Sequence, residues 1–181
     1  MHAADARLEG DREIVLTRVY DAPRTLVWQA FTQPEHLAQW WGPQGFATIT
    51  SRMDATAGGS WRYVMRGPDG REYPNLVEYL EVREPERLVY RHGGAADEEP
   101  VSFHVTVTLA EEAPRRTRVT MRSTFPSAAA RDFVVREVGA LEGGRQTLGR
   151  LAEHLVAMAR TAGAAAMVGA TATATTSAAA G

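Results

Sequence analysis

Residues 141–155 read LEGGRQTLGRLAEHL and hold four leucines in helical spacing: Leu141, Leu148, Leu151 and Leu155. Val134 and Val138 extend the same row upstream, so apolar side chains recur at multiples of three and four residues along one face. The pattern predicts one long helix over residues 128–157. The row is interrupted at Gly144, and a helix of this length tolerates one glycine at a cost of about 1 kcal/mol.

Upstream of this helix, runs of β-branched and aromatic residues alternate with turn residues. A strand is predicted over Glu13–Tyr20, and two short helices follow it before Gly42 and Pro43. Six further strands are then predicted: Phe46–Met53, Ser60–Arg66, Glu72–Val82, Arg87–His92, Val101–Leu109 and Thr117–Thr124. The breaks between them are short, and short breaks join antiparallel neighbours rather than parallel ones.

An antiparallel sheet and one long helix can each bury the apolar face of the other. We therefore predict an α+β fold in which a curved seven-stranded sheet wraps around the C-terminal helix, with two short helices after the first strand. This domain is expected to span residues 12–160. Residues 1–11 are expected to be a flexible lead-in. Residues 161–181 are nearly all Ala, Thr and Gly, and are expected to be a disordered tail.

The composition excludes several classes of function. The 181 residues include no cysteine, which excludes disulfides, thiolate metal sites and cysteine nucleophiles. All 20 basic side chains are arginine, which excludes Schiff-base chemistry. The net charge of −2 argues against nucleic-acid binding. Without a secretory signal or an apolar run of about 20 residues, we expect a cytoplasmic protein that does not span a membrane.

Four stretches of the sequence resemble the START-like, or SRPBCC, superfamily, whose helix-grip fold is best known from the birch-pollen allergen. The most specific resemblance is to the branch similar to the C-terminal domain of the activator of the 90-kDa heat-shock protein ATPase. It runs from about Arg12 to Met158, and its stretches are Tyr20–Ala30, Pro34–Pro43 with its Trp-Trp-Gly-Pro step, Glu81–Tyr90 and Glu142–Leu155.

The resemblance implies a cavity between the sheet and the long helix. Members of the superfamily bind or transform apolar small molecules there, and others act on protein partners. This chain departs from the family pattern at Gly144, where a large aromatic residue is usual. We therefore expect Gly144 to widen the cavity, with collapse of neighbouring rings into the space as the alternative.

Strand parity predicts which side chains line this cavity. The inner residues are mostly aromatic or sulfur-containing, as is typical of small-molecule pockets: Trp61, Tyr63, Met65, Tyr90, His92, Phe103 and Met121. Leu141, Gly144 and Leu148 face them from the helix. Of Trp40 and Trp41, one is expected to line the pocket. The other is expected to be a hydrophobic plug that packs the short helices against the edge of the sheet. The alternative for each residue is a plain core position.

Two questions stay open at this stage. The strand at Glu72–Val82 is apolar on both parities, so its inner face is not assigned. His92 is the one histidine on an inner parity, and it is either a general acid or base or a polar pocket residue. The histidines show no metal-ligand spacing with each other or with an acid, so neither a metal nor a cofactor is expected.

The leading hypothesis is that the domain binds an apolar or aromatic small molecule without catalysis. One alternative is an enzyme similar to polyketide cyclases or aromatases, with His92 or Tyr90 as proton donor. A second alternative, implied by the resemblance, is an interaction protein similar to the chaperone ATPase activators. A homodimer is also left open.

Overall fold

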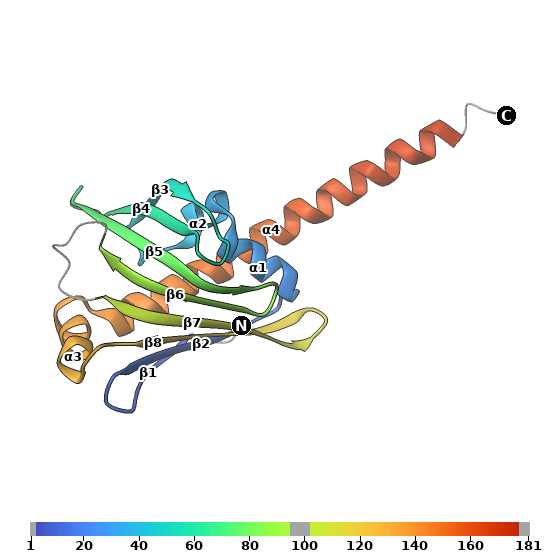
Figure 1. Ribbon diagram of the computed structural model, residues 1–181. Coiled ribbons are helices and arrows are strands. Elements are labelled where there is room, and N and C mark those ends of the chain that lie inside the picture. The colour runs from blue at the N-terminus through green and yellow to red at the C-terminus, as the bar shows by residue number, and fades with distance from the viewer. Residues whose placement is uncertain (1–2, 95–101, 178–181) are drawn as a thin grey trace.

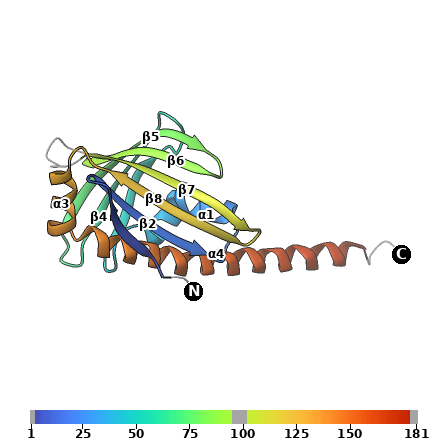
Figure 2. The ribbon, with the colours of Figure 1, turned by 90° about the horizontal axis from the view of Figure 1, so that it is seen from below.

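The computed structural model describes residues 3–94 and 102–177. The strands are β1 (Asp5–Glu9), β2 (Glu13–Tyr20), β3 (Ala47–Met53), β4 (Ser60–Arg66), β5 (Glu72–Arg83), β6 (Arg87–Gly94), β7 (Phe103–Ala113) and β8 (Arg116–Thr124). The helices are α1 (Arg24–Thr32), α2 (Pro34–Trp40), α3 (Ala128–Glu137) and α4 (Ala140–Ser177). The sheet curves over the first half of α4, and the second half of α4 projects away from it (Figures 1 and 2).

All strand pairs are antiparallel, in the order β1-β2-β8-β7-β6-β5-β4-β3. Strands β3 to β8 form the predicted meander, because each pairs with the next along the chain. The exception to sequential pairing is β2, which returns to pair with β8, so that Leu16 lies opposite Met121. The predicted α+β helix-grip fold is therefore confirmed.

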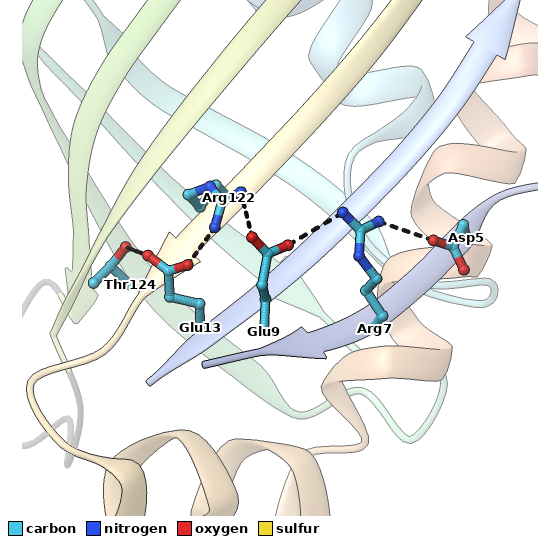
Figure 3. Close-up of polar contacts among 6 residues, drawn as sticks. All are labelled: Asp5, Arg7, Glu9, Glu13, Arg122 and Thr124. Atoms are coloured by element: carbon cyan, nitrogen blue, oxygen red, sulfur yellow. Dashed lines mark hydrogen bonds and ion pairs between the residues drawn. The ribbon is translucent and has the colours of Figure 1, made fainter. Parts of the chain in front are cut away.

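In the described part of the chain the sheet has eight strands rather than the predicted seven, because β1 forms within the expected flexible lead-in. Its odd-numbered side chains Asp5, Arg7 and Glu9 are linked by ion pairs on the sheet surface, and Arg122 continues this network to Glu13 (Figure 3). Ala6, on the other parity, is buried. This strand was missed because its even-numbered residues are only Ala6 and Leu8, and its odd-numbered residues are all charged.

The predicted continuous helix over residues 128–157 is instead two helices. Gly139 separates α3 from α4 with a φ of +67°, a left-handed conformation that glycine adopts without strain. At the start of α3, the side chain of Ser127 accepts a hydrogen bond from the Ala130 amide at 3.1 Å. None of the ten residues of α3 is buried, and Val138 after it is 67% exposed. Val134 and Val138 therefore do not extend the buried face of α4.

The expected disordered tail from residue 161 is helical as far as Ser177, and residues 178–181 lie outside the described part of the chain. Alanine is the best helix former, and a helix that is already nucleated and packed upstream propagates at little cost. The side chains at 161–164 are exposed. The limits of the domain, residues 12–160, stay a prediction. Among the described residues, none of the helices is both long and apolar enough to span a bilayer.

The core lies between the concave face of the sheet and α4. Leu148, Leu151 and Leu155 are almost completely buried there, and each contributes about 1.5–3 kcal/mol through burial. The unassigned inner face of β5 carries Val77 and Tyr79, which are 1% and 3% exposed. The pairing register of β5 shifts between Tyr79 and Glu81. This bulge exchanges the two faces of the strand, so Val82 joins Val77 and Tyr79 on the inner face. Leu80, of the same parity as Val82, is 54% exposed.

Removal of residues 165–181 is expected to change the free energy of unfolding by less than about 0.5 kcal/mol, because this part of α4 projects from the domain. Urea unfolding followed by far-UV circular dichroism measures both the stability and the lost helical signal. A matched truncation after Ala157 also removes Met158, which is buried in the core, and should cost about 2 kcal/mol or more. If the shorter truncation lowers the free energy of unfolding by as much as about 2 kcal/mol, the projecting segment packs on the domain.

Candidate functional site

An unbroken row of rings runs between the sheet and the helices, and we call it the aromatic array. Neighbouring ring centroids lie 3.9–6.5 Å apart, and the closest pair, Trp61 and Tyr63, is stacked at 3.9 Å. The array consists of Trp40, Trp41, Trp61, Tyr63, His92, Phe103 and Phe125. Six of these seven were predicted site residues. Phe125 was missed because it follows β8 and belongs to no periodic segment.

The array has one polar centre, formed by Trp41, Tyr63 and His92. The indole N–H of Trp41 donates to the Tyr63 hydroxyl at 3.0 Å, and this hydroxyl lies 2.9 Å from His92 Nε2. Burial lowers the pKa of His92 to about 4, so its ring is neutral at pH 7. His92 Nδ1 is buried and has no hydrogen-bond partner among the described residues. A buried polar atom left unpaired costs about 1–3 kcal/mol, so this nitrogen is a natural contact for a polar group.

The two neighbouring tryptophans have different roles. Trp40 is fully buried and donates to the Ala30 carbonyl at 2.9 Å, which ties α2 to α1. Trp41 is half-buried and contacts Trp61 and Tyr63 of β4. Trp40 therefore packs the two short helices together at one end of the array, and Trp41 is the tryptophan that contacts the array rings on the sheet.

Arg150 of α4 holds the Trp-Trp-Gly-Pro segment in place. Its Nη1 donates to the carbonyls of Gly42, Pro43 and Phe46 at 2.9, 3.0 and 3.1 Å, and its Nη2 donates to the Gln39 carbonyl at 3.1 Å. Burial lowers the pKa of Arg150. This residue was not predicted, because its partners are main-chain oxygens more than 100 positions away in the chain.

The other predicted site residues lie around the array rather than within it. Met65 and Leu141 are half-buried, while Met121 and Leu148 are buried in the core. Tyr90 is buried next to Tyr79, with ring centroids 6.1 Å apart. Burial raises the pKa of the Tyr90 phenol well above its usual 10. Such a phenol is a poor proton donor at neutral pH, which weakens the role of Tyr90 in the enzyme hypothesis.

Gly144 does not open the interior. A Cβ atom placed on Gly144 would lie 2.7 Å from Leu16 Cδ1 and 2.8 Å from Leu16 Cδ2. The side chain of Leu16, on β2, therefore occupies the space that the usual aromatic residue would fill. The expectation that this glycine widens a cavity is wrong, and its stated alternative, filling by a neighbour, is what the structure shows.

A separate groove of about 340 Å³ lies over β1, β2 and β8. Its charged lining includes Arg7, Arg116 and Arg118. Arg7 is paired with Asp5 and Glu9, and both Arg116 and Arg118 are paired with Glu112. Arg18, which also lines the groove, donates to the Leu148 carbonyl. A groove lined by so many charged side chains does not suit an apolar ligand, so the aromatic array is the better candidate site. In the described part of the chain, no three histidine or acidic side chains gather as a metal site.

Comparison with known proteins supports the resemblance. The family model described as Activator of Hsp90 ATPase homolog 1-like protein matches residues 21–156. A solution structure from Arthrobacter aurescens is 27% identical with a TM-score of 0.78, covering 84% of this chain and 91% of that one. Protein Ms6760 from Mycobacterium smegmatis is 28% identical with a TM-score of 0.77, covering 86% and 99%. No curated protein matches.

A more distant structural neighbour is CalU16 from Micromonospora echinospora. It is 23% identical with a TM-score of 0.56, and the alignment covers 86% of this chain and 85% of that one. This likeness concerns the fold alone.

His92→Gln is expected to reduce the acid sensitivity of the fold. The folded pKa of about 4 lies below the usual 6.5, so the unfolded chain takes up the proton first as the pH falls. The free energy of unfolding of the parent therefore decreases from pH 6.5 downward, by roughly 2–3 kcal/mol at pH 4.5 from this residue. Urea unfolding at pH 7.5 and 4.5 measures the parent-minus-variant difference. If that difference is the same at both pH values, the His92 pKa is not depressed.

Gly144→Leu is expected to destabilise the protein by about 1–3 kcal/mol, because the new side chain overlaps Leu16. In a Leu16→Ala background the same substitution should cost less, with a coupling energy of about 0.5–3 kcal/mol. Urea unfolding of the parent, the two single variants and the double variant gives the four free energies of unfolding from which this coupling energy is calculated. A cost of Gly144→Leu that is equal in both backgrounds would mean that the two positions do not share one space.

Proposed function

Since the chain belongs to the Activator of Hsp90 ATPase homolog 1-like protein family, we propose that it binds a planar, uncharged aromatic molecule against the aromatic array. The rings of Trp41, Trp61 and Phe103 supply the apolar contacts, and His92 Nδ1 supplies one hydrogen bond. The observation that carries the proposal is this buried ring nitrogen, which lacks a partner among the described residues and lies within a row of aromatic side chains.

The chemistry of the polar centre limits the ligand to two kinds of polar group. If the Tyr63 hydroxyl donates to His92 Nε2, the ring proton is on Nδ1, and Nδ1 donates to a ligand carbonyl. If Nε2 carries the proton, Nδ1 accepts from a ligand hydroxyl. A neutral imidazole and a neutral phenol favour an uncharged partner in a buried setting, since an unpaired buried charge is costly. Aromatic ketones and phenols fit both conditions.

Entry of the ligand requires a part of the structure that moves at low cost. α3 is the best candidate, because none of its residues is buried and it packs chiefly against α4. It is joined to α4 through Gly139 and to the array through Phe125, which stacks on Phe103 at a centroid distance of 4.7 Å. A displacement of α3 would expose little core surface, and local openings of this kind draw on the least stable parts of a fold.

Binding is favoured over catalysis because the candidate acid and base groups at the site exchange protons poorly at neutral pH. A His92 pKa of about 4 makes the ring a poor base at pH 7, and a general base works best near the operating pH. Tyr90 is too weak an acid to serve as its complement. A chaperone partner, which the family name suggests, remains an expectation from the resemblance.

Titration with the fluorescent ketone prodan, a neutral naphthalene derivative, tests this proposal. The parent should bind it with a blue shift of its emission, and His92→Phe, which keeps the ring but removes the hydrogen bond, should bind it about 5–10-fold more weakly. Naphthalene has no polar atom, so its affinity should be similar for both proteins. Absence of prodan binding to the parent would overturn the proposal.

Two further variants complete the experiment. Trp41→Leu removes a ring of the array and should weaken both probes. Tyr79→Phe is the matched control, since Tyr79 is buried beside Tyr90 rather than in the array, and its substitution should leave both affinities unchanged. Equal affinity of prodan for the parent, His92→Phe and Trp41→Leu would place the binding site elsewhere.

A further inference from the structure

Two histidines that are 118 positions apart in the chain meet where α2 lies against α4. His36 Nδ1 and His154 Nε2 are 3.1 Å apart, and the two ring centroids are 5.1 Å apart with an interplanar angle of 55°. Both side chains are half-buried, so the pair is reached by water. Neither residue belongs to the aromatic array. Because they lie far apart in the sequence, no motif predicts that they are in contact.

The two facing nitrogens have the geometry of a chelate. Only one hydrogen can lie between them, so at least one nitrogen offers its lone pair to the other. A tetrahedral zinc ion with bonds of about 2.0–2.1 Å would hold two imidazole nitrogens about 3.3–3.4 Å apart. The rings therefore need to separate by only a few tenths of an ångström to admit such an ion.

The charged side chains near the pair also suit a cation. Arg150 lies one helical turn before His154, but its guanidinium is engaged by main-chain carbonyls of the 39–46 segment. Glu35 and Glu153, each adjacent in sequence to one of the histidines, are exposed and contribute negative charge to this surface.

We propose that His36 and His154 form a two-ligand site for a divalent late transition-metal ion, Zn²⁺, Ni²⁺ or Cu²⁺, which clamps α2 to α4. Imidazole suits these ions, whereas Mg²⁺ and Ca²⁺ prefer oxygen ligands. No group of three or more metal-ligating side chains exists in the described residues, so water completes the coordination and the ion exchanges readily. The clamp would hold the first turn of α2, four residues before Trp40, and it does not depend on the proposed ligand site.

The test is calorimetric titration of the full chain with ZnCl₂ and NiCl₂, in a His2→Gln background and without a histidine tag. His2 lies outside the described residues, and its removal excludes binding at the chain terminus. We expect one ion per chain with a dissociation constant in the micromolar range, and a melting temperature that rises with metal concentration. MgCl₂ should produce neither effect.

Single variants assign the ligands. His36→Gln and His154→Gln should each weaken Zn²⁺ binding at least tenfold and abolish the rise in melting temperature. His104→Gln, at an exposed position of β7, is the matched control and should behave like the parent. If both variants of the pair bind Zn²⁺ within twofold of the parent, or if the parent binds none at 1 mM ZnCl₂, the proposal is wrong.

A second measurement uses the unaltered pair, which covers the case of a variant that fails to fold. Paramagnetic Cu²⁺ added in substoichiometric amounts should broaden the imidazole NMR signals of His36 and His154 before those of His92 and His104. Equal broadening of all the histidine signals would contradict a site at this pair.

Discussion

The structure depends on one contact: the burial of a single face of α4 against the concave side of the sheet. Leu148 and Leu151 are completely buried there, and Gly144 lets the helix backbone approach Leu16 of β2 closely. Two side chains of β2 then bond to the helix backbone, since the Tyr20 hydroxyl and Arg18 Nη1 donate to the Leu148 carbonyl at 3.0 and 3.3 Å. A large side chain at position 144 would separate these surfaces, so the glycine permits close packing rather than an empty volume.

The candidate site is a consequence of this packing. With α4 in place, Arg150 can gather the carbonyls around Gly42 and Pro43, and the segment so held presents Trp41 to the sheet. Trp41 in turn donates to Tyr63, and Tyr63 contacts His92. The His92 nitrogen that has no partner among the described residues is thus the end of a chain of contacts that begins on the helix. A protein that needed only a stable core would gain by placing an apolar ring there.

Two positively charged side chains bind α4 to its surroundings without carboxylate partners in the described contacts. Arg150 and Arg18 both donate to main-chain oxygens, and Arg18 is only 8% exposed. Carbonyl groups are weaker partners than carboxylates but are fixed in direction, so they position the guanidinium groups precisely enough to orient the segments that carry them. On the sheet surface the arginines of β1 and β8 instead pair with glutamates, as Figure 3 shows for Arg7 and Arg122.

The sequence by itself determined the fold class, the antiparallel order of strands β3 to β8, the apolar face of α4 and most rings of the array. These features are periodic, and periodicity along the chain reports which side chains share a face. Strand β1 was not predicted because its outward residues are all charged. The break at Gly139 was not predicted because the apolar spacing continues through it. Only the tertiary structure decided which tryptophan contacts the array rings on the sheet, that Leu16 fills the space beside Gly144, and that His36 meets His154. Each of these is a contact between segments far apart in the chain, and its geometry follows from packing that no local pattern records.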